Sequence, residues 1–271
     1  MQNLTDRPAL LRNRARARTR GMADFLHRVA IDEVQDRIGM VNKPFTDVAI
    51  VTGHGSIWSE AFPDAQVVPD DETLALEPLT CDLVIHAMAL HWASDPVGQL
   101  IQCRRALRPD GVFLGIAPGG QTLHELRACL AEAEIAASGG LSPRVAPMGE
   151  VRDLGALLQR AGLNLPVADS LPLRVVYPHV LALMHDLRAM GEANAMADRL
   201  RTPTPRGIIT DTAARYAETY PAPEGGIEAT VELIALTGWA PDESQPKPLR
   251  PGSATARLAD ALGSTETKLP D

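Results

Sequence analysis

A buried strand, a helix and a second strand follow one another directly in the middle of the chain, and this succession restricts the fold most. The apolar run CDLVIHAMAL at 81–90 predicts the first strand. Residues 94–108 predict a helix with Asp95 as its N-cap, residues 109–111 (Pro-Asp-Gly) predict a turn, and residues 112–117 predict the next strand. Such β-α-β units build parallel sheets with helices on their faces.

Periodic segments extend this unit in both directions. Residues 46–53 predict another buried strand, and residues 9–39 predict a helix without a break before it. The remaining predictions are helices at 121–138, 150–161, 178–190 and 206–219, and strands at 166–177 and 227–239.

The composition indicates a packed globular protein and excludes several function classes. Apolar residues make up 45% of the 271 residues, and the formal net charge is -8. A general nucleic-acid binder needs a surplus of basic residues to neutralise phosphates, which this chain lacks. No apolar run is long enough for a membrane helix. The three cysteines form no CxxC pair, so no metal site is predicted.

Six arginines lie between Arg7 and Arg20, against the single acid Asp6. This composition resembles a transit peptide. We prefer a basic N-terminal helix, because the helical pattern continues beyond the length of a removable presequence. The arginines then form a solvated face, or they contact an acidic partner or lipid headgroups.

Four stretches together resemble a known family. They are CDLVIHAMALHWASDP (81–96), ALRPDGVFLGIAPGGQTLHELR (106–127), GGLSPRVAPMGEVRDLGALLQRAGL (139–163) and TGWAPDESQPKPLRPGSA (237–254). The pattern resembles the methyltransferase-like assembly factors of respiratory complex I, a branch similar to the malonyl-carrier-protein methyltransferase of biotin synthesis. The LRPDG turn occurs in many class I methyltransferases, whereas GGQTLHELR with the C-terminal stretch is more specific.

The resemblance implies a Rossmann-like, doubly wound α/β sheet that is mostly parallel with an antiparallel last strand. Adenosylmethionine then lies over the C-terminal ends of the first strands. The implied cofactor-binding residues are Gly53, His54, Gly55, Asp70, Asp71, Ala87 and Met88.

The cofactor half departs from the family pattern. Val51 stands where an acid is expected, and Ile57 stands in place of a third glycine. Only 25 residues separate Gly55 from Cys81, too few for two strands with their helices. We expect one short helix and one short strand there, and we align residues 67–78 with the third-strand acidic segment of the family.

On that alignment the second strand and its ribose-binding acid are missing. Asp70, Asp71 and Glu72 then face the adenine, or they form an ordinary solvated charge run. Without a charged acceptor worth about 1.5–3 kcal/mol, adenosylmethionine binding weakens by roughly one to two orders of magnitude.

Candidate substrate-binding residues follow the fourth and fifth strands of the family pattern. Trp92 stacks on a ligand or belongs to the core, and the charges near the start of helix 121–138 contact substrate or cover an ordinary helix surface. No catalytic base is assigned. The candidates are His91, Trp92, Thr122, Glu125, Arg127 and Arg144.

These observations predict five segments. They are N-terminal helices at 1–45, a methyltransferase-like core at 46–177, a helical lid at 178–226, a last core strand at 227–241 and an extended tail at 242–271.

The functional expectation is an adenosylmethionine-dependent methyltransferase-like protein that acts on a protein substrate linked to complex I assembly. The eukaryotic members that the pattern resembles are linked to arginine hydroxylation on a complex I subunit. The alternative is a degenerate methyltransferase fold that serves as an assembly chaperone. The expected location is the bacterial cytoplasm near the inner membrane, with peripheral membrane association, or the mitochondrial matrix.

Overall fold

The structure is a computed structural model that describes residues 4–246 and residue 263. Its elements are α1 (Arg7–Arg20), α2 (Phe25–Met40), β1 (Val48–Thr52), α3 (Gly55–Ala61), β2 (Gln66–Val68), β3 (Cys81–Ala87), the 3-10 helix η1 (Leu90–Trp92), α4 (Pro96–Ala106), β4 (Leu107–Gly119), α5 (His124–Ser138), α6 (Val151–Arg160), β5 (Asn164–Tyr177), α7 (Val180–Ala189), α8 (Arg206–Thr219) and β6 (Ile227–Trp239).

The strands form one sheet in the order β2-β1-β3-β4-β6-β5. Neighbouring strands from β2 to β4 are parallel, and β6 is antiparallel to both β4 and β5. Within the described residues, β6 is therefore the one strand that runs against the others. The predicted fold, a mostly parallel sheet with an antiparallel last strand, is confirmed.

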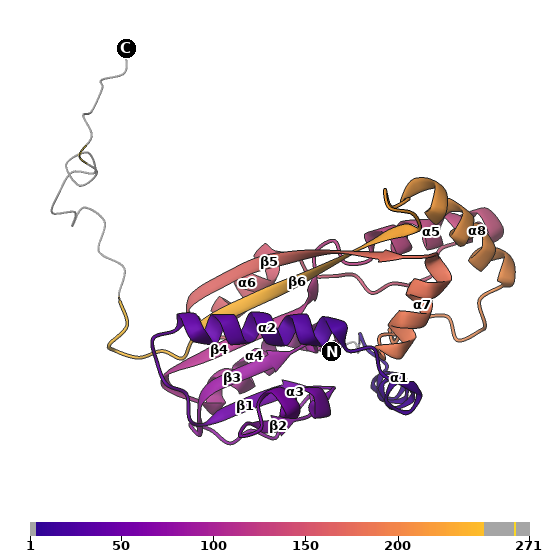
Figure 1. The fold of residues 1–271 in the computed structure, drawn as a ribbon. Coiled ribbons are helices and arrows are strands. Elements are labelled where there is room, and N and C mark those ends of the chain that lie inside the picture. Colours follow the sequence, from indigo (N-terminus) through magenta and orange to yellow (C-terminus); the bar gives the residue numbers. More distant parts are fainter. Residues whose placement is uncertain (1–3, 247–262, 264–271) are drawn as a thin grey trace, which may run out of the picture. The chain divides into compact units, whose positions relative to one another are not determined.

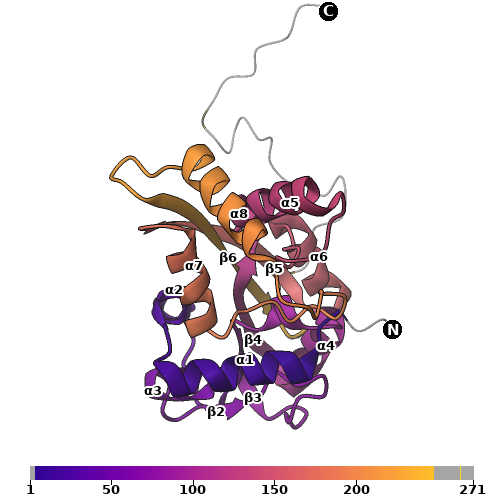
Figure 2. The same ribbon diagram turned by 90° about the vertical axis from the view of Figure 1, so that its right-hand side faces the viewer.

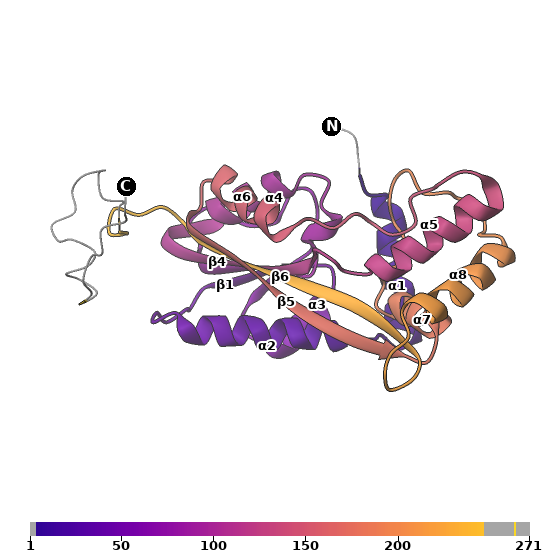
Figure 3. The same cartoon turned by 90° about the horizontal axis from the view of Figure 1, so that it is seen from above.

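Helices cover both faces of the sheet (Figures 1 and 3). Helix α2 packs on one face, where Ala30, Ile31 and Val34 join a core cluster with residues of β1, β3 and β4. Helices α4 and α6 cover the other face, where Leu100 and Leu158 are buried. A third group, α1, α5, α7 and α8, gathers at one end of the sheet (Figure 3).

The sheet is shortened beside β1, as the small number of residues between Gly55 and Cys81 predicts. Between Gly55 and Cys81 the structure contains only α3 and β2. Strand β2 pairs directly with β1, with Val67 opposite Ile50. The segment that the sequence aligned with the third strand of the family therefore lies next to the first strand, because no other strand separates them.

Three local predictions were wrong. The expected unbroken helix at 9–39 is broken between α1 and α2, where Gly21 adopts φ 86°. The first strand of the central unit ends at Ala87, before η1. The expected Pro-Asp-Gly turn is part of β4, with Asp110 at φ 60°. The predicted N-cap is confirmed, since the Asp95 side chain accepts a hydrogen bond from the Gly98 amide.

Helices α7 and α8 lie between β5 and β6 in the chain, within the segment 178–226 predicted as a lid. Their role as a lid stays a prediction. Residues 242–271 form a separate unit. Within that unit the structure describes only 242–246 and 263, so the rest of the predicted tail lies outside the described residues. No described helix is long and apolar enough to cross a membrane.

Candidate functional site

The predicted cofactor residues meet at the end of the sheet where β1, β2 and β3 finish. Strand β1 ends at Thr52, whose hydroxyl oxygen accepts a hydrogen bond of 3.2 Å from the His54 amide. Asp70 follows β2 after one proline, and the Met88 amide donates to the carbonyl of Ile116 at 2.7 Å. The structure therefore brings together residues from three separate segments, as the sequence predicts.

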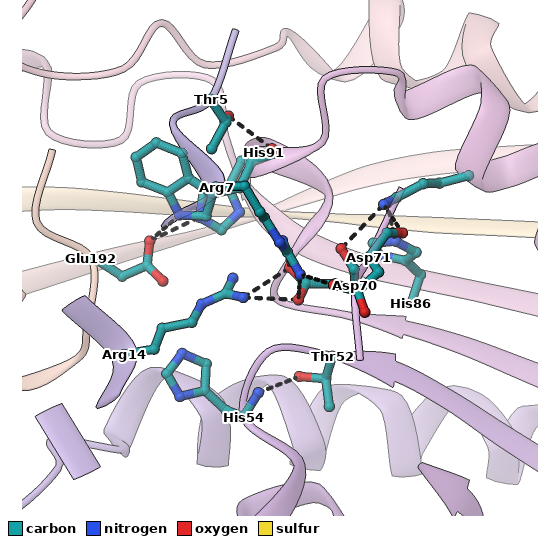
Figure 4. A network of polar contacts seen from close by, with 12 residues as sticks. Thr5, Arg7, Arg14, Thr52, His54, Asp70, Asp71, His86, His91 and Glu192 are labelled. Atoms are coloured by element: carbon teal, nitrogen blue, oxygen red, sulfur yellow. Dashed lines mark hydrogen bonds and ion pairs between the residues drawn. The ribbon is translucent and has the colours of Figure 1, made fainter. Parts of the chain in front are cut away.

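Helix α1 crosses this end of the sheet (Figure 2) and places Arg14 among the strand ends. The Arg14 side chain is only 1% exposed. Its Nη1 donates to both carboxylate oxygens of Asp70, at 2.8 and 2.9 Å (Figure 4). Arg7 donates to the same two oxygens at 3.1 and 2.8 Å, and to Asp71 at 2.9 Å. The expectation that these arginines form a solvated face is therefore wrong for Arg7 and Arg14.

Asp70 is buried, whereas Asp71 and Glu72 are exposed. Burial by itself raises the pKa of Asp70, but the hydrogen bonds and charges of Arg7 and Arg14 outweigh it and hold the pKa at about 2. The carboxylate is therefore ionised at neutral pH, with both oxygens already bonded to arginine.

Gly53 lies in contact with the same guanidinium group. A Cβ atom built on Gly53 would overlap the terminal nitrogen and carbon of Arg14. The absence of a side chain at Gly53 thus makes room for Arg14, which fills the space beside the turn. In this arrangement Arg14 Nη1 pairs with Asp70 where the family places its cofactor, while Arg14 Nε and Nη2 are buried without a hydrogen-bond partner among the described residues.

Two histidines are buried under the same helix. The rings of His54 and His27 lie 4.6 Å apart, and His27 Nδ1 accepts a hydrogen bond of 3.1 Å from the indole of Trp58. Neither ring nitrogen of His54 has a partner within the described residues. Burial lowers the pKa of His27 to about 3 and that of His54 to about 4, with nearby positive charge contributing to both. Both rings are therefore neutral at pH 7. His27 was missed by sequence reasoning, because it lies inside an ordinary amphipathic helix.

A cavity of about 420 Å³ adjoins this cluster, between η1, α5 and α7. Its lining is mainly apolar and includes four of the eight methionines of the chain, Met88, Met148, Met184 and Met190. Methionine side chains adapt their shape, which suits a surface that receives an irregular apolar group.

Of the six predicted substrate residues, His91, Trp92, Thr122 and Arg144 line this cavity. Arg144 Nη2 donates to Glu134 Oε1 at 2.6 Å, and its Nη1 donates to the Thr204 hydroxyl at 2.7 Å. Met88 is the one predicted cofactor residue in the lining.

Glu125 and Arg127 have other partners. Glu125 Oε1 accepts a hydrogen bond of 2.9 Å from the Thr230 amide and a second from its hydroxyl. Arg127 donates to the carbonyls of Thr122 and Ala146, each at 3.4 Å. Glu125 therefore ties α5 to β6, and neither residue lines the main cavity.

Glu192 is the carboxylate of the cavity, and it directly follows α7 and its turn. Its Oε2 accepts hydrogen bonds from His91 Nε2 at 3.0 Å and from the Trp92 indole at 2.6 Å. Its Oε1 has no hydrogen-bond partner in the part of the chain that the structure describes. Burial raises the pKa of Glu192, but the charge and hydrogen bond of His91, with Arg14 and Trp92, lower it to about 2. The cavity therefore contains an ionised acceptor with one oxygen available.

Comparison with known proteins agrees with this architecture. Residues 44–115 match the family described as methyltransferase domain. The chain carries a class I methyltransferase domain. The YcgJ protein of Bacillus subtilis has a similar fold, with a TM-score of 0.51 and 11% identity, over 80% of this chain and 100% of that one.

The sequence relatives include mitochondrial proteins. The arginine-hydroxylase NDUFAF5 of Danio rerio is 40% identical over 73% of this chain and 61% of its own length. The human protein of the same name is 39% identical over 77% of this chain and 60% of its own length. A malonyl-[acyl-carrier protein] O-methyltransferase of Methylovorus is 33% identical over 65% of this chain and 56% of that protein. The chain thus spans less than two thirds of the length of these relatives. The family resemblance that the sequence predicts is confirmed.

Proposed function

We propose that this protein acts in the assembly of respiratory complex I as a binding protein. It receives an arginine side chain of a complex I subunit in the cavity beside Glu192, and it works with its cofactor position closed by α1. The observation that carries this proposal is the Arg14–Asp70 ion pair, which is buried against Gly53.

The residues at the strand ends do not fit adenosylmethionine in this arrangement. Close approach of a cofactor to Gly53 requires the space that the Arg14 guanidinium fills. An adenosine group that approaches Asp70 needs a free carboxylate oxygen as its acceptor, whereas both oxygens of Asp70 accept hydrogen bonds from arginine. This supports the chaperone alternative over catalysis.

The chemistry of the cavity supports an arginine as the bound group. A guanidinium group donates parallel hydrogen bonds to a carboxylate and stacks on aromatic faces. Glu192 offers the free carboxylate oxygen, and Trp92 lies beside it in the lining. The names of the mitochondrial relatives, which are arginine hydroxylases, favour the same side chain in the partner.

A second candidate function is methyl transfer to a protein substrate, and the family match favours it. That activity would require α1 to withdraw Arg14 from the Gly53 turn. Because the two functions differ in their need for adenosylmethionine, direct titration with this cofactor separates them.

Replacing Glu192 with glutamine is expected to weaken partner binding by roughly 10- to 100-fold, because one charge-assisted hydrogen bond is lost. The measurement uses the purified full chain on an array of overlapping peptides that cover the complex I subunits of the same organism. The strongest peptides should lose binding when a single arginine is replaced with glutamine.

The matched control is Glu218→Gln, an exposed carboxylate on α8, which should leave peptide binding unchanged. Equal binding by wild type and Glu192→Gln, or binding that ignores the arginine of the peptide, would contradict the proposal. Thermal unfolding of both variants identifies any loss caused by misfolding.

A further inference from the structure

The cavity beside Glu192 is larger than one arginine side chain requires. Its volume of about 420 Å³ lies in the range of roughly 300–1,000 Å³ that encloses a whole drug-sized molecule. The proposed function places a guanidinium group at Glu192 and leaves the rest of this volume unassigned. A second group of the partner therefore has room in the cavity.

The two ends of the cavity differ in chemistry. Trp92, which donates to Glu192, packs in a small cluster beside α1. The lining residues Leu130 of α5 and Leu183 and Met184 of α7 belong to a different hydrophobic cluster. The cavity thus has a polar end at Glu192 and an apolar end between α5 and α7.

An exposed leucine extends the apolar lining to the surface. Leu200, in the loop between α7 and α8, lines the cavity and is 54% exposed. Met184 is also partly exposed. Apolar surface that continues into a pocket is typical of a binding site. The apolar end is therefore accessible to an incoming group.

The charges of the lining limit the chemistry of the occupant. Arg144 and Arg199 each form an ion pair with an acidic residue outside the lining, and Arg188 is exposed to solvent. Glu192 is ionised, and its Oε1 accepts no hydrogen bond from the described residues. A fatty acid would bring a second carboxylate to Glu192, and a pure hydrocarbon would leave Oε1 without a donor. The occupant therefore combines a cation with an apolar group.

We infer that the bound segment carries a bulky aliphatic or aromatic side chain close to its arginine, and that this side chain enters the apolar end between α5 and α7. The inference rests on the proposed function, in which the arginine binds Glu192. Side chains two residues apart in an extended segment, or three to four apart in a helix, point in the same direction. The apolar residue therefore lies at one of these spacings from the arginine, and Met184 and Leu200 determine its selection.

The test uses fluorescent synthetic peptides with a glycine–serine background and the purified full chain. One peptide contains arginine alone, one contains leucine alone, and the others contain arginine with leucine two, three or four positions to either side. In the best of these spacings, leucine should tighten binding by roughly 10- to 100-fold over arginine alone, because its side chain leaves water. Fluorescence anisotropy measures each affinity.

The double variant Met184→Gln with Leu200→Ser should lose most of this advantage of leucine, because it places polar groups at the apolar end. The matched control is Leu181→Ser, an exposed leucine of α7 that does not line the cavity. This control should keep the full advantage. Thermal unfolding of both variants identifies any loss caused by misfolding.

The outcomes separate this inference from the proposed function. If leucine gives no advantage at any spacing while Glu192→Gln still weakens binding of the arginine peptides, the inference is overturned and the proposed function stands. If leucine alone binds as tightly as leucine with arginine, the proposed function is wrong. An advantage of leucine that survives unchanged in the double variant would place the leucine outside the apolar end and also overturn the inference.

Discussion

Replacing Arg14 with methionine is expected to lower the free energy of unfolding by about 3–5 kcal/mol, because it leaves the buried carboxylate of Asp70 without its innermost partner. Arg7 also contacts Asp70 and is only partly buried, which places the expected loss near the lower end of this range. Urea unfolding at pH 7 measures the change.

The second arm of this experiment removes both charges. Arg14→Met combined with Asp70→Asn should be more stable than the sum of the two single changes predicts, by about 1–3 kcal/mol, because no uncompensated charge remains between them. Arg12→Met, on the exposed face of the same helix, is the matched control and should change stability by less than about 0.5 kcal/mol. Additive losses from Arg14 and Asp70 would mean that the two side chains do not form the pair described above.

Stability is also expected to fall as the pH drops from about 6.5 to 4, because His54 and His27 are buried as neutral rings. Their pKa values in the folded protein, about 4 and about 3, lie below the ordinary value of 6.5. The unfolded chain therefore takes up protons in this range while the folded chain does not, which favours unfolding. For His54 alone, the loss amounts to roughly 3 kcal/mol.

The carboxylates act in a lower pH range. The lowered pKa values of Asp70 and Glu192, each about 2, lie below the ordinary values of 3.8 and 4.5, so they contribute stability that is fully present above about pH 5.5 and is lost as pH falls toward 2. Urea unfolding at pH 7 and 5.5 should therefore isolate the histidines, and at pH 4 the comparison with a variant that lacks both histidines separates their contribution from that of the carboxylates. In the double variant His27→Gln with His54→Gln, the decline between pH 6.5 and 4 should largely disappear, and glutamine can still accept the Trp58 hydrogen bond. A decline as steep as in wild type would mean that groups other than His27 and His54 cause the pH dependence of stability.

The sheet was predictable because its strands carry continuous apolar runs. The run at 81–90 and the β-α-β unit around it required a parallel sheet, and the short distance from Gly55 to Cys81 required a reduced edge. The position of β2 was not predictable in the same way. Pairing partners of a three-residue strand depend on which neighbour remains exposed, and here β1 is that neighbour.

The candidate site was predicted in outline but not in its interactions. Gly53 and Asp70 meet as the family pattern implies, yet nothing local marks Arg14 as different from the other arginines of α1. Its burial results from the break at Gly21, which lets α1 turn away from α2 and cross the strand ends. Long-range ion pairs of this kind depend on tertiary packing, which periodicity along the chain does not encode.

The interactions of Glu192 were equally hidden, although the sequence places Glu192, like Arg144 and Asn194, in family-like segments outside the sheet. It lies in a loop after α7, and its donors His91 and Trp92 come about a hundred positions earlier in the chain. The sequence indicated His91 and Trp92 as substrate residues, because they follow a strand end. The carboxylate that joins them could be recognised only once the cavity was visible.

Isothermal titration of the full chain with adenosylmethionine tests the central claim most directly. If Arg14 and Asp70 close the cofactor position, wild type should give no binding heat at micromolar cofactor concentrations, and the malonyl-[acyl-carrier protein] O-methyltransferase of Methylovorus serves as a positive control. Binding with micromolar affinity, abolished by both Gly53→Val and Asp71→Ala, would contradict the account and favour the methyltransferase activity.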